Sequence, residues 1–185
     1  MNGLYAFLTI IQGLRDLLLL DVKAFARFDA TPAGAGWSFL ASALVAPFHF
    51  LSITLATGDS DGLNGGQAVV LVIDYVVRWT AWPVLLWSLC PRIACRRERY
   101  FHYLTVSNWF AATETLLFLS TTLVPVIENS DAVLFTLVFS MLLLYEWFIT
   151  RCTLLVSRGT ASLLVASNLF LGMVIARTTQ IMVGG

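Results

Sequence analysis

GQAVVLVIDYVVRWTAWPVLLWSL, residues 66–89, is the stretch of sequence that decides the fold. It is long and apolar enough to cross the hydrocarbon core of a bilayer, which takes about 20 helical residues. Near its middle lie Asp74 and Arg78, which are four residues apart and share one face of a helix. Charged side chains are costly at this depth, so both must find partners inside the protein. The stretch therefore predicts a membrane-spanning helix that carries part of a buried polar network.

The composition places the whole chain in the same class. Of its 185 residues, 58% are hydrophobic and 12% are charged, whereas soluble domains are about 25% charged. The formal net charge is zero, so no overall basic balance points to a nucleic-acid partner. These values predict an all-α integral membrane protein.

Five apolar runs predict a bundle of five transmembrane helices. They cover residues 37–56, 66–89, 103–127, 132–149 and 160–176, followed by a short tail over 177–185. The connection at 128–131 is so short that the third and fourth spans form an antiparallel hairpin. The segment 57–67, TGDSDGLNGGQ, resembles a calcium-binding loop only superficially, and we interpret it as a flexible loop.

The N-terminal run over residues 4–28 is apolar but interrupted by charges. Its polar side chains recur at roughly helical spacing, namely Thr9, Gln12, Asp16, Lys23 and Arg27. This stripe predicts one or two amphipathic helices that lie in the membrane interface. The alternative, a span over residues 4–20, would place Arg15 and Asp16 deep in the bilayer. We expect an interfacial segment over 1–30 and a five-helix domain over 31–185, with a turn-rich break at 29–37.

The basic residues predict the orientation of the spans. The segments before the first span, between the second and third, and between the fourth and fifth contain Arg15, Lys23, Arg27, Arg92, Arg96, Arg97, Arg99, Arg151 and Arg158. The two opposite loops contain none. Because positive loops stay in the cytoplasm, we expect a cytoplasmic N-terminus and an outer C-terminus, in a bacterial inner membrane. The four arginines at 92–99 are also candidates for contact with lipid headgroups.

A polar network is expected near the middle of the bundle. A helical rise of about 1.5 Å per residue places Arg78 and Glu114 near the midplane. Asp74 lies about one turn further out, close to the level of His49. We therefore expect Arg78 to be shared by Asp74 and Glu114, with His49 capping Asp74.

On the inner side, Glu146 lies near the level of Asn108, and both Asn108 and Arg151 are its expected partners. The first interpretation of the whole set is structural, since polar contacts hold helices together in lipid. The second is functional, because three deep acids outnumber one deep base and a protonatable acid beside a histidine can relay protons. A third is that some of these groups face another subunit.

Two stripes of small residues suggest close helix packing or a surface for a partner. One is Ser38, Ser42 and Ala46 in the first span, and the other is Asn168, Gly172 and Ala176 in the fifth. They favour binding to other membrane proteins, to a second copy of the chain, or to lipid.

No motif of an enzyme or of a cofactor site is present. The chain lacks a phosphate-binding glycine loop, a G-x-S-x-G and an H-E-x-x-H. Its three cysteines, Cys90, Cys95 and Cys152, are too few for a disulfide framework, and C-x4-C is too wide for a typical structural zinc site. We expect no enzymatic activity, no metal and no cofactor.

The layout resembles that of the Yip family of five-span membrane proteins and the small bacterial membrane proteins grouped with it. The resemblance rests on span count, orientation, short outer loops and FDATPAGAGWSFLASALVAPF at residues 28–48. It implies a non-enzymatic membrane protein that acts through partners and supplies no catalytic residue.

These observations predict a non-catalytic accessory or scaffold protein that binds membrane proteins or lipid through its spans. The alternative is a small proton-coupled transporter or ion-conducting protein that uses the intramembrane acids.

Overall fold

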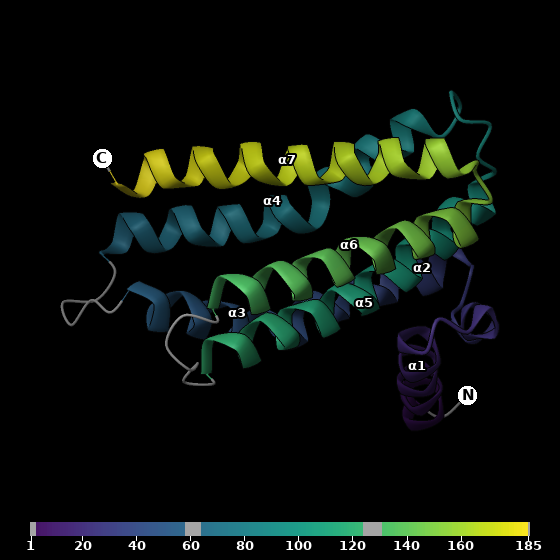
Figure 1. Cartoon of the computed structure of the whole chain (residues 1–185), viewed down its shortest axis with the longest axis horizontal. Coiled ribbons are helices and arrows are strands. Elements are labelled where there is room, and N and C mark those ends of the chain that lie inside the picture. Colours follow the sequence, from purple (N-terminus) through teal and green to yellow (C-terminus); the bar gives the residue numbers. More distant parts are fainter. Residues whose placement is uncertain (1–2, 58–63, 124–130, 185) are drawn as a thin grey trace.

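The computed structural model describes residues 3–57, 64–123 and 131–184, and every regular element in them is a helix (Figure 1). The elements are α1 (Gly3–Leu18), the 3₁₀ helix η1 (Val22–Arg27), α2 (Pro32–Ser38), α3 (Leu40–Thr57), α4 (Gly65–Leu89), α5 (Arg97–Leu123), α6 (Asp131–Leu154) and α7 (Arg158–Gly184). The predicted all-helical class is confirmed for this part of the chain.

Four stretches are long and apolar enough to cross a membrane. They are Pro32–Thr54, which joins α2 and α3, then Gly65–Leu89, Val133–Leu154 and Arg158–Val183. Each overlaps one of the predicted spans. The remaining predicted span corresponds to α5, which has 27 residues and is not among the four.

The long helices α3 to α7 extend along the long direction of the molecule (Figure 1). Helix α5 packs against α2, α3 and α6, while α7 packs against α4 and α6. Because successive helices reverse direction, the N-terminal segment and the connections at 90–96 and 155–157 meet at one end of the bundle. All the basic residues that predict the orientation lie at or near this end, which we call the basic end.

Two segments differ from the sequence prediction. Most of α2 lies in residues 29–37, which we expected to be a turn-rich break. This helix forms because Thr31 accepts a hydrogen bond from the Gly34 N–H and Pro32 occupies the first turn. Beyond Ala176, where we predicted a tail, α7 continues to Gly184. The predicted loop at 57–67 and the hairpin connection at 128–131 lie largely outside the described residues, but Asn64 and Gln67 form a reciprocal cap that starts α4.

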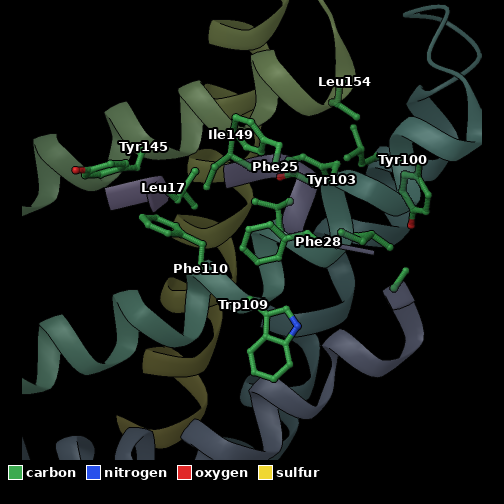
Figure 2. Close-up of a cluster of buried hydrophobic side chains, with 14 of the residues drawn as sticks. Leu17, Phe25, Phe28, Tyr100, Tyr103, Trp109, Phe110, Tyr145, Ile149 and Leu154 are labelled. Carbon is green, nitrogen blue, oxygen red and sulfur yellow. The ribbon is translucent and has the colours of Figure 1, made fainter. Parts of the chain in front are cut away.

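The tightest packing lies at the basic end (Figure 2). The N-terminal segment contributes Leu17, Phe25 and Phe28, which pack with buried side chains of α5 and α6. Three hydrogen bonds reinforce this contact: Tyr145 Oη donates to the Leu18 carbonyl oxygen, Thr105 Oγ1 donates to that of Asp29, and His102 Nε2 lies 2.9 Å from that of Phe25. The core therefore includes residues on both sides of the predicted boundary at 30/31. Figure 1 shows α1 crossing the direction of the long helices at this end.

Candidate functional site

A polar cavity lies in the middle of the bundle. One lobe, between α4, α5, α6 and α7, has a volume of about 460 Å³, and a second lobe of about 300 Å³ extends toward α3. Five residues line both lobes: Arg78, Trp82, Glu114, Glu146 and Asn168. We call this space the central cavity.

Asp74 and Arg78 form an ion pair at the edge of the cavity, as the sequence predicts. Arg78 Nε donates to Asp74 Oδ2 at 2.6 Å, one turn away on α4. The second carboxylate oxygen of Asp74 accepts a hydrogen bond from Thr179 Oγ1 on α7. The buried carboxylate is thereby fully engaged, and the charge of Arg78 is balanced within its own helix.

Glu114 and Glu146 bring two further carboxyl groups to the cavity from α5 and α6. Asn168 Nδ2 donates to Glu146 Oε1. Glu114 makes no hydrogen bond or ion pair within the described part of the chain, so the expected sharing of Arg78 between Asp74 and Glu114 is wrong. Arg78 is the only lysine or arginine among the described residues that line the cavity. The cavity therefore holds two acids, and its one arginine is already paired with Asp74.

His49 does not cap Asp74, because Thr179 takes that position. Instead the imidazole lies against Tyr75, with ring centroids 4.9 Å apart. Its Nε2 is buried without a hydrogen-bond partner, and the residue lines the lobe toward α3. His49 thus contributes a polar atom that nothing in the described chain satisfies.

The expected partners of Glu146 are also wrong. Asn108 Nδ2 donates to Ser38 Oγ at 2.9 Å, because this face of α5 packs against α2. Arg151 lies over the ring of Trp147 at 5.5 Å, close to the basic end. The partner that Glu146 does have, Asn168, was predicted only as part of a small-residue stripe.

The two small-residue stripes have different surroundings: one packs against neighbouring helices and the other lines the central cavity. Ser38 is fully buried against α5, and the carbonyl oxygen of Ser42 accepts a hydrogen bond from Tyr75 Oη, with Ala46 half-buried one turn further on. On α7, Asn168, Gly172 and Ala176 line the central cavity. The first stripe packs inside the bundle, and the second leaves room for the cavity.

The floor of the cavity toward the basic end contains a pair that sequence reasoning missed. Trp82 Nε1 donates to Tyr103 Oη at 2.8 Å, and both side chains are buried. Nothing in the sequence predicts that these two residues form a hydrogen bond. Trp82 lies about two turns before the end of α4 and Tyr103 about two turns after the start of α5, and aromatic residues at such positions indicate only an aromatic layer. Thr179 was missed because the predicted span ended at Ala176.

The arginine cluster stays at the surface of the basic end. Arg92, Arg96 and Arg97 are exposed and Arg99 is half-buried, and none of them forms an ion pair within the described residues. Arg97 lies over the ring of Trp87 at 5.6 Å. This arrangement leaves the charges available to lipid headgroups, as the sequence suggests.

The three cysteines are free thiols. Burial raises the pKa of Cys90 to about 12 and also raises the pKa of Cys95, in the connection between α4 and α5. No cluster of three or more histidine, cysteine or acidic side chains that could hold a metal ion occurs among the described residues.

Comparison of the chain with known protein families, curated proteins and solved structures gives no match.

Proposed function

We propose that the chain crosses the membrane five times, with α5 as the third of the five spans and the basic end in the cytoplasm. Two observations support a spanning α5: it lies alongside the four apolar helices, and it packs between α3 and α6. Its buried residues include polar Thr105 and Asn108 beside Tyr103, Val106 and Phe110. A helix enclosed by its neighbours meets little lipid, so it tolerates such polar residues better than an outer helix. The collection of arginines at one end supports the orientation and a bacterial inner membrane, while the Yip resemblance stays a prediction.

We further propose that the central cavity binds a small cation and exchanges it for a proton. The observation that carries this proposal is Glu114, a carboxyl group that faces the cavity with no partner in the described chain. Glu146 adds a second carboxyl group, and Arg78 is balanced by Asp74. Opposite charges attract strongly where water is scarce. The part of the central cavity next to Glu114 and Glu146 therefore favours a positively charged ligand.

Proton coupling follows from the balance of charge. Without a cation, a proton bound to one glutamate reduces the repulsion between the two acids. A cation that enters the cavity replaces this proton, and the proton leaves to water. Asn168 and the unpaired Nε2 of His49 add polar groups along the same cavity. Binding on one side and release on the other would give cation–proton exchange.

The test uses purified protein in phospholipid vesicles that contain a pH-sensitive dye and an acidic interior. Adding Na⁺ or K⁺ outside should raise the interior pH with the wild-type protein. Glu114→Gln should abolish this change, because the amide cannot release a proton. Glu98→Gln is the matched control, since Glu98 is an exposed acid in the first turn of the same helix.

Equal flux for wild type and Glu114→Gln would refute a role for this carboxyl group. Absence of flux with every cation, for wild-type protein that circular dichroism shows to be helical, would refute exchange altogether.

An accessory role is the second candidate, and Gly172 favours it. A Cβ at this position would meet no atom within 4 Å, so packing within the chain does not require a glycine there. Gly172 also lines the central cavity, so a helix of another protein that approached this face closely would cover the cavity. Gly172→Leu should then remove a partner that co-purifies with the wild type, whereas Ala166→Leu, at an exposed α7 position outside the stripe, should not. Retention of the same partner by both variants would eliminate this surface.

A further inference from the structure

A second hollow lies outside the helix bundle, between the N-terminal segment and the long helices. It is a groove with a volume of about 580 Å³. Phe7 and Ile10 of α1 form one wall, Trp37 and Leu40 form the other, and Trp109 of α5 lies between them. The rings of Phe7 and Trp109 meet edge to face, with centroids 6.3 Å apart. We call this space the α1 groove.

The walls of the α1 groove suit a hydrocarbon chain. Trp37 is 69% exposed, and Phe7 and Leu40 are also exposed, so the groove is open to whatever surrounds the bundle. In a membrane protein with α1 at the interface, the surroundings at this level are lipid acyl chains. The groove also lies near the basic end, where exposed arginines collect.

Most polar groups that line the α1 groove are already engaged. Thr9 Oγ1 donates to the Tyr5 carbonyl oxygen, and Thr105 Oγ1 donates to those of Asp29 and Phe101. The carboxylate of Asp29 accepts a hydrogen bond from the Thr31 N–H at the start of α2. These groups do not need a ligand.

Two donors along the α1 groove remain available. Trp109 is only 8% exposed, yet its indole N–H makes no hydrogen bond within the described part of the chain. The guanidinium of Arg27 uses Nε for Asp16 at 2.9 Å and Nη1 for Gln12 at 3.3 Å, which leaves Nη2 without a partner in the described chain. The Arg27 side chain is 40% exposed. An accessible N–H on a largely buried indole and an arginine beside an apolar groove can bind the ester and phosphate groups of an amphiphile.

We propose that the α1 groove binds one anionic phospholipid of the surrounding bilayer. One acyl chain lies between α1 and the α2–α3 junction, and the indole N–H of Trp109 donates to an ester carbonyl oxygen. The phosphate accepts hydrogen bonds from Arg27. A net negative headgroup is favoured because Arg27 lines the groove and Lys23, on the same short helix η1, is exposed. The bound lipid would fix α1 against the bundle, independently of any transport through the central cavity.

The test is native mass spectrometry of the full chain, purified in mild detergent and exchanged into micelles with equal amounts of phosphatidylglycerol and phosphatidylcholine of the same acyl chains. The wild type should retain one lipid per chain, with about a fivefold preference for phosphatidylglycerol. Both lipids offer the phosphate to Arg27, but only phosphatidylcholine adds a choline cation, which the guanidinium repels. Ala6→Phe, which places a ring in the groove, should remove the retained lipid. Leu8→Phe is the matched control, because Leu8 lies on α1 but outside the groove.

Two further variants separate the polar contacts. Trp109→Phe keeps the aromatic ring and should weaken retention of both lipids severalfold. Arg27→Gln should abolish the preference for phosphatidylglycerol while a lipid is still retained. Undiminished retention by Ala6→Phe would overturn the site, and equal retention of the two lipids by the wild type would overturn the anionic specificity.

Discussion

Removal of Arg78 should destabilise the protein far more than removal of an exposed arginine that also has an acidic partner. Arg78→Gln leaves the carboxylate of Asp74, which is 5% exposed, with Thr179 as its remaining partner. Breaking one side of a buried ion pair costs about 3–5 kcal/mol. Since the Arg78 side chain is itself 35% exposed along the cavity, we expect a loss at the lower end, about 3 kcal/mol.

The control is Arg15→Gln. Arg15 also pairs with an aspartate, Asp16, at 3.2 Å, but its side chain is 76% exposed. Asp16 additionally keeps its ion pair with Arg27. An exposed pair contributes about 0–1 kcal/mol, so this variant should unfold close to the wild type.

The assay is reversible unfolding in mixed micelles of a mild detergent and dodecyl sulfate, followed by far-ultraviolet circular dichroism. The double variant Asp74→Asn/Arg78→Gln closes a thermodynamic cycle with the two single variants. Because the double variant leaves no unpaired charge, it should recover part of the loss, with a coupling energy of at least about 1 kcal/mol. Equal losses for Arg78→Gln and Arg15→Gln, or a coupling energy near zero, would refute the reasoning that the pair is desolvated.

Three other perturbations test particular contacts. The raised pKa of Cys90 means that its contribution to stability is complete below about pH 9 and is lost as the pH rises toward about 12. Unfolding measured across this range should show the decline, and Cys90→Ala should reduce it; the Cys95 thiol, whose pKa burial also raises, contributes in the same direction. Trp82→Phe removes the donor to Tyr103 Oη inside the core and should cost about 1–2 kcal/mol in the same unfolding assay, while Trp87→Phe, at an exposed position with no hydrogen bond among those of the described chain, should cost less. Tyr145→Phe releases the Leu18 carbonyl oxygen and should speed amide exchange at the end of α1; unchanged exchange there would mean that this contact does not hold the segment.

Local sequence rules predicted the elements of the fold well, because each depends on neighbours in the chain. The opening stretch predicted α4 to within one residue, and the spacing of Asp74 and Arg78 predicted their contact. The rise along a helix also gave the level of each polar residue in the bundle. The rise does not give the rotation of each helix about its own axis, which decides the neighbour that a side chain faces. The wrong partners predicted for Glu146 and Arg78 follow from this missing information.

Glu146 illustrates the difference. Asn108 and Asn168 both lie near its level, on α5 and α7, so depth alone could not choose between them. Packing of α5 against α2 turns Asn108 toward Ser38, and packing of α7 against α6 turns Asn168 toward the glutamate. In the same way, Thr179 became the partner of Asp74 because α7 extends beyond its predicted end.

The location of the central cavity follows from the uneven packing of the bundle. On α5 no residue from 111 to 117, the last whose burial is described, is buried, and on α7 none of the residues from 166 to 183 is buried. Glu114 and Asn168 lie in these stretches, where tight packing at the basic end gives way to space. Helix α4 changes direction along its length (Figure 1), and Pro83, which cannot donate a helical hydrogen bond, lies within it beside Trp82. Under the proposed exchange, a path toward the basic end has to pass the hydrogen bond between Trp82 and Tyr103. That pair and the bend next to it are therefore where movement of α4 would connect the cavity to the basic end.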